Sequence, residues 1–153
     1  MSKTFVRLAV VAAAAFCSAA FADTQNLTVN ATVSGTCKLT SVPTMSFTLD
    51  PSSGAAASSS STVQYRCTKG VSSTGFTVAG INTGTKAITL AGGTGNTDTI
   101  PVTLTWTNPS AYTGVGFTSG TAGSVVINGA IAANTYDVKA DTYSTTVAIS
   151  ITP

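Results

Sequence analysis

Apolar residues recur at every second position through most of the chain, and this period of two restricts the fold more than any other feature. The segment TIPVTLTW places Val102, Leu104 and Trp106 on one side, which is the pattern of a strand with one buried face. Thr, Val, Ile and aromatic residues, which suit a pleated surface, fill such segments. After residue 22 no segment shows a 3.6-residue period, so the sequence predicts an all-β domain.

Turn-forming residues separate the alternating segments. Two clear examples are DPSSG at 50–54 and GGTGN at 92–96. About seven short strands with this punctuation predict an antiparallel β-sandwich. Pro101 indicates an edge or entry position in its strand, and the low-complexity run 54–62 predicts a loop. The expected strands are 44–49, 61–68, 75–81, 86–91, 99–106, 124–128 and 142–152.

Residues 1–22 have the layout of a secretory signal peptide. Lys3 and Arg7 supply a positive start, the apolar run LAVVAAAAF follows, and a small-x-small cleavage site precedes Asp23. The apolar run is shorter than the roughly 20 residues that a membrane span needs. The sequence therefore predicts export through the periplasm, with cleavage before Asp23.

The chain without this signal carries little charge and few reactive groups. The whole chain has 7 Lys+Arg and 5 Asp+Glu; the signal holds two of the basic residues and none of the acidic ones, which leaves five of each. No basic patch remains for nucleic acid or acidic lipid. Histidine and glutamate are absent, and with them the usual proton-transfer groups. We expect neither an enzyme nor a cofactor nor a metal site, and a neutral surface suits a protein that ends up assembled.

Two weak candidates for a cation site have simpler explanations. The run GGTGNTDTI at 92–100 has the glycines of a calcium-binding repeat but only one copy of it, and a hairpin loop explains the same residues. Asp137 and Asp141 lack a third ligand nearby, which favours a solvated loop or strand edge.

Cys37 and Cys67 are the cysteines that remain after removal of the signal. In an exported, oxidising context a disulfide is the expected state. The alternative, a metal site, lacks partners because the chain has no histidine. Closing a loop of about 30 residues stabilises a fold by roughly 3–4 kcal/mol in the chain-entropy model.

A strong alternation lies directly after the predicted cleavage site, in TQNLTVNATVSGTC at 24–37. Free ends of domains are usually loose, so a strand here needs a sheet to join. From the residues alone two answers stay open: the first strand of the chain's own sheet, or a strand that pairs with another molecule. The apolar side consists of Leu27, Val29, Ala31 and Val33.

The last part of the chain is the most distinctive. It runs VVINGAIAANTYDVKADTYSTTVAISITP (125–153), with a Gly-Ala-Ile element at 129–131, a polar spacer, Tyr143 in a turn and a final alternating strand. This order of elements resembles the C-terminal signature of the spore coat protein U domain family, which includes archaic chaperone–usher pilins. Asp141 and Pro153 stand where that family has a glycine and an aromatic residue. The placement of the two cysteines extends the resemblance over the mature chain.

The resemblance implies an immunoglobulin-like antiparallel β-sandwich that lacks its final strand. In such pilins a periplasmic chaperone lends a strand, and at the outer-membrane usher the N-terminal extension of the next subunit replaces it, which is strand addition to a sheet edge. For this chain it implies a signal peptide at 1–22, a donor extension at 23–34 and a pilin domain at 35–153. The donor side chains are then Leu27, Val29, Ala31 and Val33, and the groove wall and chaperone contact are Val147, Ile149 and Ile151.

The function implied by the resemblance is that of a structural subunit of a surface pilus (fimbria), serving adhesion and biofilm formation. Its partners are a transient chaperone and usher, and related subunits in a head-to-tail polymer. The alternative is a self-contained secreted β-sandwich, such as a coat or matrix protein or a small binding module. In that case residues 24–34 form the first strand of the chain's own sheet.

Overall fold

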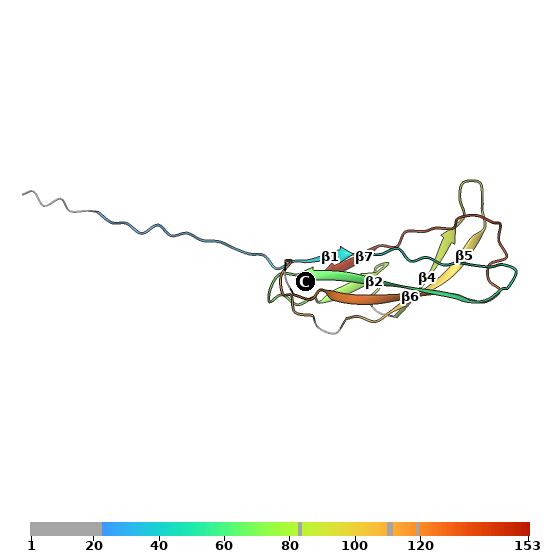
Figure 1. Ribbon diagram of the computed structural model, residues 1–153. Helices are drawn as coiled ribbons and strands as arrows, with labels where there is room; N and C mark the ends of the chain where they lie inside the picture. The colour runs from blue at the N-terminus through green and yellow to red at the C-terminus, as the bar shows by residue number, and fades with distance from the viewer. Residues whose placement is uncertain (1–22, 83, 110–111, 119) are drawn as a thin grey trace, which may run out of the picture. The chain divides into compact units, whose positions relative to one another are not determined.

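The computed structural model describes residues 23–153 except 83, 110, 111 and 119 (Figure 1). These residues contain strands and no helix, which confirms the predicted all-β class. The predicted signal peptide, 1–22, lies outside the described residues, and residues 33–153 form one compact unit. The strands are β1 (Cys37–Ser41), β2 (Ala57–Cys67), β3 (Gly75–Val78), β4 (Gly84–Ala91), β5 (Thr99–Trp106), β6 (Gly123–Ile131) and β7 (Ile149–Thr152).

The strands form two antiparallel sheets. One has five strands in the order β1-β2-β6-β5-β4, and the other pairs β3 with β7. The ladder between β2 and β6 runs without interruption from Ala57 opposite Ile131 to Tyr65 opposite Gly123. This ladder forms the middle of the larger sheet (Figure 1).

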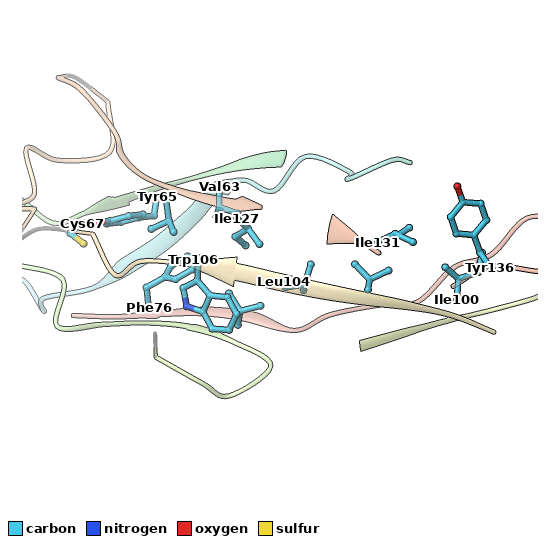
Figure 2. Close-up of a cluster of buried hydrophobic side chains, with 13 residues drawn as sticks. Val63, Tyr65, Cys67, Phe76, Ile100, Leu104, Trp106, Ile127, Ile131 and Tyr136 are labelled. Atoms are coloured by element: carbon cyan, nitrogen blue, oxygen red, sulfur yellow. The ribbon is translucent and has the colours of Figure 1, made fainter. Parts of the chain in front are cut away.

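Side chains from both sheets form one hydrophobic cluster. Strands β5 and β6 bury every second residue, as alternation requires. Figure 2 shows the side chains of β2, β5 and β6 gathered in the same layer as Phe76 of β3. Full burial of one such residue stabilises a fold by roughly 1.5–3 kcal/mol, so this shared layer holds the two sheets together. The cluster comprises Val63, Tyr65, Cys67, Phe76, Val78, Ile100, Val102, Leu104, Trp106, Val125, Ile127, Ile131 and Tyr136.

Polar atoms of the buried aromatic residues have hydrogen-bond partners, as such atoms require. The Trp106 indole N–H donates to the Asn82 carbonyl at 2.9 Å, and the Tyr136 hydroxyl donates to the Ala55 carbonyl. These bonds fix two connecting segments onto the core.

The serine-rich run at 54–62 is not the loop that its composition predicts. Strand β2 begins at Ala57, and the serines that follow pair with β6. The Ser61 side chain is buried, and its hydroxyl donates to the Pro43 carbonyl at 2.8 Å. A neighbouring strand along residues 57–62 therefore outweighs the weak strand preference of serine, and only 54–56 lie outside a strand.

Pro101 lies where the sequence places it. It is paired with Thr89 of β4, whereas the ladder between β5 and β6 begins only at Thr103. The proline therefore belongs to a part of β5 with a paired neighbour on one side only, which suits a residue without an N–H.

Three predicted strands are absent or shortened. No strand is formed at 44–49, and the expected 75–81 strand ends at Val78. Of the expected 142–152 strand, 149–152 forms β7, and Ser144 adds a single bridge to Ala91. The side chains of Met45, Phe47 and Leu49 are still half-buried, and the residues between them are exposed. The alternation thus correctly predicts which side chains face the core, but no neighbouring strand is present to pair with the backbone.

The predicted disulfide is present. Cys37 and Cys67 lie directly opposite each other in the register of β1 and β2, and their sulfur atoms are bonded. The bond links β1, at the edge of the five-stranded sheet, to its neighbour β2.

Replacing both cysteines, as Cys37→Ser with Cys67→Ser, is expected to lower the free energy of unfolding by roughly 3–4 kcal/mol, because the unfolded chain regains the loop entropy. Urea unfolding of the exported chain, with and without reductant, measures this difference. Two free thiols in the exported protein, detected by mass spectrometry, would contradict the bond.

Candidate strand-binding groove

Two extended segments flank the apolar face of the larger sheet without belonging to it. The first, 42–49, follows β1, and the second, 143–148, leads into β7. In Figure 1 the chain after β1 and the chain before β7 carry no strand arrow along these stretches. Both segments line the same hollows on the molecule.

The backbone of these segments is largely unpaired. Among the described residues, 42–49 make no backbone–backbone hydrogen bond, and the Pro43 carbonyl accepts only from the Ser61 hydroxyl. Residues 145–147 likewise make none within the described part of the chain, while the Ala148 carbonyl accepts from the Ala79 N–H at 2.8 Å. Unpaired strand edges of this kind are sites at which another strand adds.

Two hollows lie between the segments, above the floor of the five-stranded sheet. The first has a volume of about 300 Å³ and the second about 710 Å³. They share lining residues on both segments, and we call them together the groove. Its N-terminal wall is 42–49, and its C-terminal wall is 143–149, which is the second segment together with Ile149, the first residue of β7. The residues that line both hollows are Thr44, Met45, Phe47, Leu90 and Thr145.

The floor of the groove is apolar and reaches the core. Val102 and Leu104 of β5 and Ile127 of β6 line the first hollow and belong to the buried cluster. Of the residues that line the two hollows, only Lys139 and Asp141 carry a charge. An apolar side chain that entered the groove would therefore leave water without displacing ionic contacts.

Gly129 of β6 allows the N-terminal wall to lie close to the sheet. A Cβ atom at this position would meet the Met45 sulfur and would lie 2.7 Å from the tip of the Phe47 ring. This close approach gives a physical reason for the glycine in the Gly-Ala-Ile element of the sequence.

The structure distributes the predicted groove residues unequally. Val147 and Ile149 line the first hollow and are half-buried. Ile151 is half-buried too, but it lies opposite Phe76 in the β3–β7 ladder and lines neither of these hollows. The sequence-based prediction missed the opposite wall, with Met45 and Phe47, although the alternation at 44–49 is the signal that marks it.

The predicted donor residues are exposed. The exposed fractions of Leu27, Val29 and Val33 are 88%, 81% and 80%, and Ala31 is exposed too. Residues 24–34 form no strand in the structure. Monomeric soluble proteins rarely expose several large apolar side chains close together.

The Asp141 carboxylate lies just before the C-terminal wall and connects this part of the chain to the loop between β4 and β5. Hydrogen bonds from the Asn96 side chain, the Thr142 N–H and the Gly93 N–H lower the pKa of Asp141 below its ordinary value of 3.8. A lowered pKa means that the ionised form stabilises the fold at higher pH, and that this contribution is lost as the pH falls through the folded-state pKa. Asp50, next to the N-terminal wall, has a lowered pKa for a similar reason, because the Ser52 hydroxyl and N–H donate to it.

The described residues contain no group of three or more His, Cys, Asp or Glu side chains that could hold a metal ion. In the same part of the chain, no helix is both long and apolar enough to span a membrane.

One comparison with known proteins gives a match. The sequence profile of the Spore Coat Protein U domain matches residues 23–150, a range that starts where the signal peptide is predicted to end and includes both walls of the groove. No curated protein and no solved structure matches the chain.

Gly129→Val is expected to lower the free energy of unfolding by roughly 1–3 kcal/mol, because the added methyl groups push Met45 and Phe47 away from β6. Ala130→Val, on the exposed side of the same strand, is the matched control and should change stability by no more than about 0.5 kcal/mol. Urea midpoints of the two variants measure the difference. Equal midpoints would show that the N-terminal wall does not pack on Gly129.

Proposed function

Since the chain belongs to the Spore Coat Protein U domain family, we propose that it is a structural subunit of a surface pilus (fimbria), in which the groove of one copy takes up residues 24–34 of the next. One observation carries the proposal: the same chain has an apolar groove with unpaired edges and an exposed segment with the sequence of a strand. The fibre stands at the cell surface and serves adhesion and biofilm formation.

The lengths of the two parts agree. A strand rises about 3.3 Å per residue, so the eight residues of the N-terminal wall, 42–49, extend over roughly 26 Å. Residues 27–33, which carry the four apolar donor side chains, extend over roughly 23 Å on the same basis. One donor strand therefore fills the groove from end to end.

The energy of insertion is comparable to the stability of a small domain. Burial of Leu27, Val29, Val33 and Ala31 contributes on the order of 5–8 kcal/mol as an upper range, and each new backbone hydrogen bond adds about 0.5–1.5 kcal/mol. A small domain is stable by about 5–15 kcal/mol in total. Residues 24–34 include no charged residue, so these apolar and backbone contacts supply the affinity.

The donor strand in a groove comes from another copy, because the connection between residues 24–33 and β1 is too short for this segment to turn back into the groove of its own chain. Only residues 34–36 separate Val33 from β1. An antiparallel hairpin with its turn at 34–35 places Val33 opposite Thr36 and Leu27 opposite Val42, so the donor lies alongside β1 and reaches only the first residue of the N-terminal wall. A parallel arrangement needs a connection of about a dozen residues. Groove and donor are thus different surfaces, and such contacts extend into a head-to-tail fibre.

Before assembly the open groove needs a temporary occupant. Unpaired strand edges beside an apolar floor pair readily with unrelated chains. In this proposal a periplasmic chaperone covers the groove, and an outer-membrane usher is the place where the donor strand of the next subunit replaces it. The disulfide fits this route, since such bonds form in oxidising compartments.

Two complementary variants of the mature chain test the proposal. Leu27→Asp with Val29→Asp disables the donor and leaves the groove intact, whereas Val147→Asp disables the groove and leaves the donor intact. The unaltered chain is expected to form long polymers, each variant alone to remain monomeric, and their equimolar mixture to stop at dimers. Light scattering after size-exclusion chromatography measures the masses.

Thr28→Asp with Asn30→Asp is the matched control, because it adds the same charge to the polar side of the donor. This control variant should still polymerise. Polymers from the donor-disabled variant, or a stable unaltered monomer that never polymerises, would contradict the proposal and favour a self-contained coat, matrix or binding protein.

A further inference from the structure

The C-terminal wall of the groove is fixed at both ends and free between them. At one end β7 pairs with β3, beginning with Ile149 opposite Val78. At the other end Ser144 exchanges two backbone hydrogen bonds with Ala91, at 3.0 and 2.9 Å. Residues 145–147 between these points make no hydrogen bond among the described residues, so the position of the wall depends on its two ends.

Asp141 reinforces the end of the wall at Ser144, which is not part of a paired strand. One carboxylate oxygen accepts from the Gly93 N–H and from the Asn96 side-chain amide, both at 2.9 Å. The other oxygen accepts from the Thr142 N–H at 2.7 Å. Hydrogen bonds to an ionised carboxylate are stronger than those between neutral groups. Asp141 therefore connects the chain just before the wall to the loop between β4 and β5.

Gly93 is shaped for this contact. A Cβ atom at position 93 would lie 3.2 Å from both carboxylate oxygens of Asp141, so the N–H reaches the carboxylate because no side chain stands in the way. The loop itself is held by the Asn96 side chain, whose oxygen accepts from the Asp98 N–H at 3.0 Å.

Further bonds make the connection a network. The Asn96 amide donates to the Tyr143 hydroxyl at 3.0 Å, and that hydroxyl donates to the Lys139 carbonyl at 2.8 Å. The Lys139 N–H donates to the Asp98 carboxylate at 3.0 Å. The chain on both sides of Asp141 is thus attached to the loop that follows β4. Strand β4 lies at the edge of the five-stranded sheet opposite β1, from which the N-terminal wall continues.

We propose that Asp141, through Gly93 and Asn96, is a positioning residue that holds the C-terminal wall away from the N-terminal wall, so that the empty groove stays open to the donor strand. The proposal rests on the function proposed above. Two walls with unpaired backbone over an apolar floor lower their free energy by closing on each other. The network around Asp141 opposes this closure because it fixes the wall to the β4–β5 loop.

The predicted effect lies in the rate of donor capture. When only a fraction of molecules has an open groove, the apparent affinity falls by that fraction. Once the donor is in place, its own backbone hydrogen bonds hold both walls, so the network around Asp141 is no longer needed. Loss of this network should therefore slow association of the donor and leave its dissociation almost unchanged.

The test uses the mature chain with Leu27→Asp and Val29→Asp, which keeps an intact groove, and a labelled peptide that copies residues 24–34. Association and dissociation rates are measured by fluorescence anisotropy. Adding Asp141→Asn is expected to slow association by about tenfold, with dissociation changed less than about twofold. Asn96→Ala should act in the same direction. Asp137→Asn removes an exposed carboxylate of the same segment and should leave both rates unchanged.

Hydrogen exchange gives a second, peptide-free measurement: the amides of Thr142 and Ser144, which donate hydrogen bonds in the structure, should exchange faster in Asp141→Asn and as in the parent in Asp137→Asn. If the parent captures the peptide, two results would overturn this inference alone. One is an unchanged association rate in both Asp141→Asn and Asn96→Ala. The other is a change in the dissociation rate as large as the change in the association rate. Failure of the parent to capture the peptide would instead overturn the proposed function.

Discussion

Backbone hydrogen bonding is the constraint on which the rest of this structure depends. A strand is stable when the N–H and C=O groups of both edges have partners or face water. The N-terminal wall, 42–49, has the sequence and side-chain burial of a strand but lacks a backbone partner, and residues 145–147 share this condition within the described chain. The exposed segment 24–34 has the complementary property, because it has a strand sequence without a sheet. We interpret the three as parts of one ladder that two copies complete.

The sequence predicted best those strands whose neighbours follow closely in the chain. The segment 99–106 forms β5 with the predicted bounds, and 86–91 lies within β4, because the two are joined by a short hairpin loop. The alternation predicted side-chain burial at 44–49 equally well. The predicted strand at 44–49 is nevertheless absent, since the period of two reports which face is buried and not whether a partner strand exists.

Features that depend on contacts between distant segments were not predictable in the same way. The serine-rich part of β2 became a strand because β6 lies beside it, more than sixty residues further along the chain. The bonds between Asp141 and the β4–β5 loop likewise join residues 45 and 48 positions apart. The sequence identified Asp141 only as a carboxylate of a solvated edge, whereas the structure shows three hydrogen bonds to it. The disulfide was predictable because only two cysteines remain to pair.

Hydrogen exchange of the wall amides, compared between the polymer and the donor-disabled monomer, distinguishes pairing between copies from pairing within one chain. We expect rapid exchange at 44–49 and 145–147 in the monomer, and strong protection of both segments together with 27–33 in the polymer. Protection of the walls already in the monomer would show that the edges are paired within one chain. A polymer in which 27–33 and the walls remain unprotected would show that the copies are held together by other surfaces.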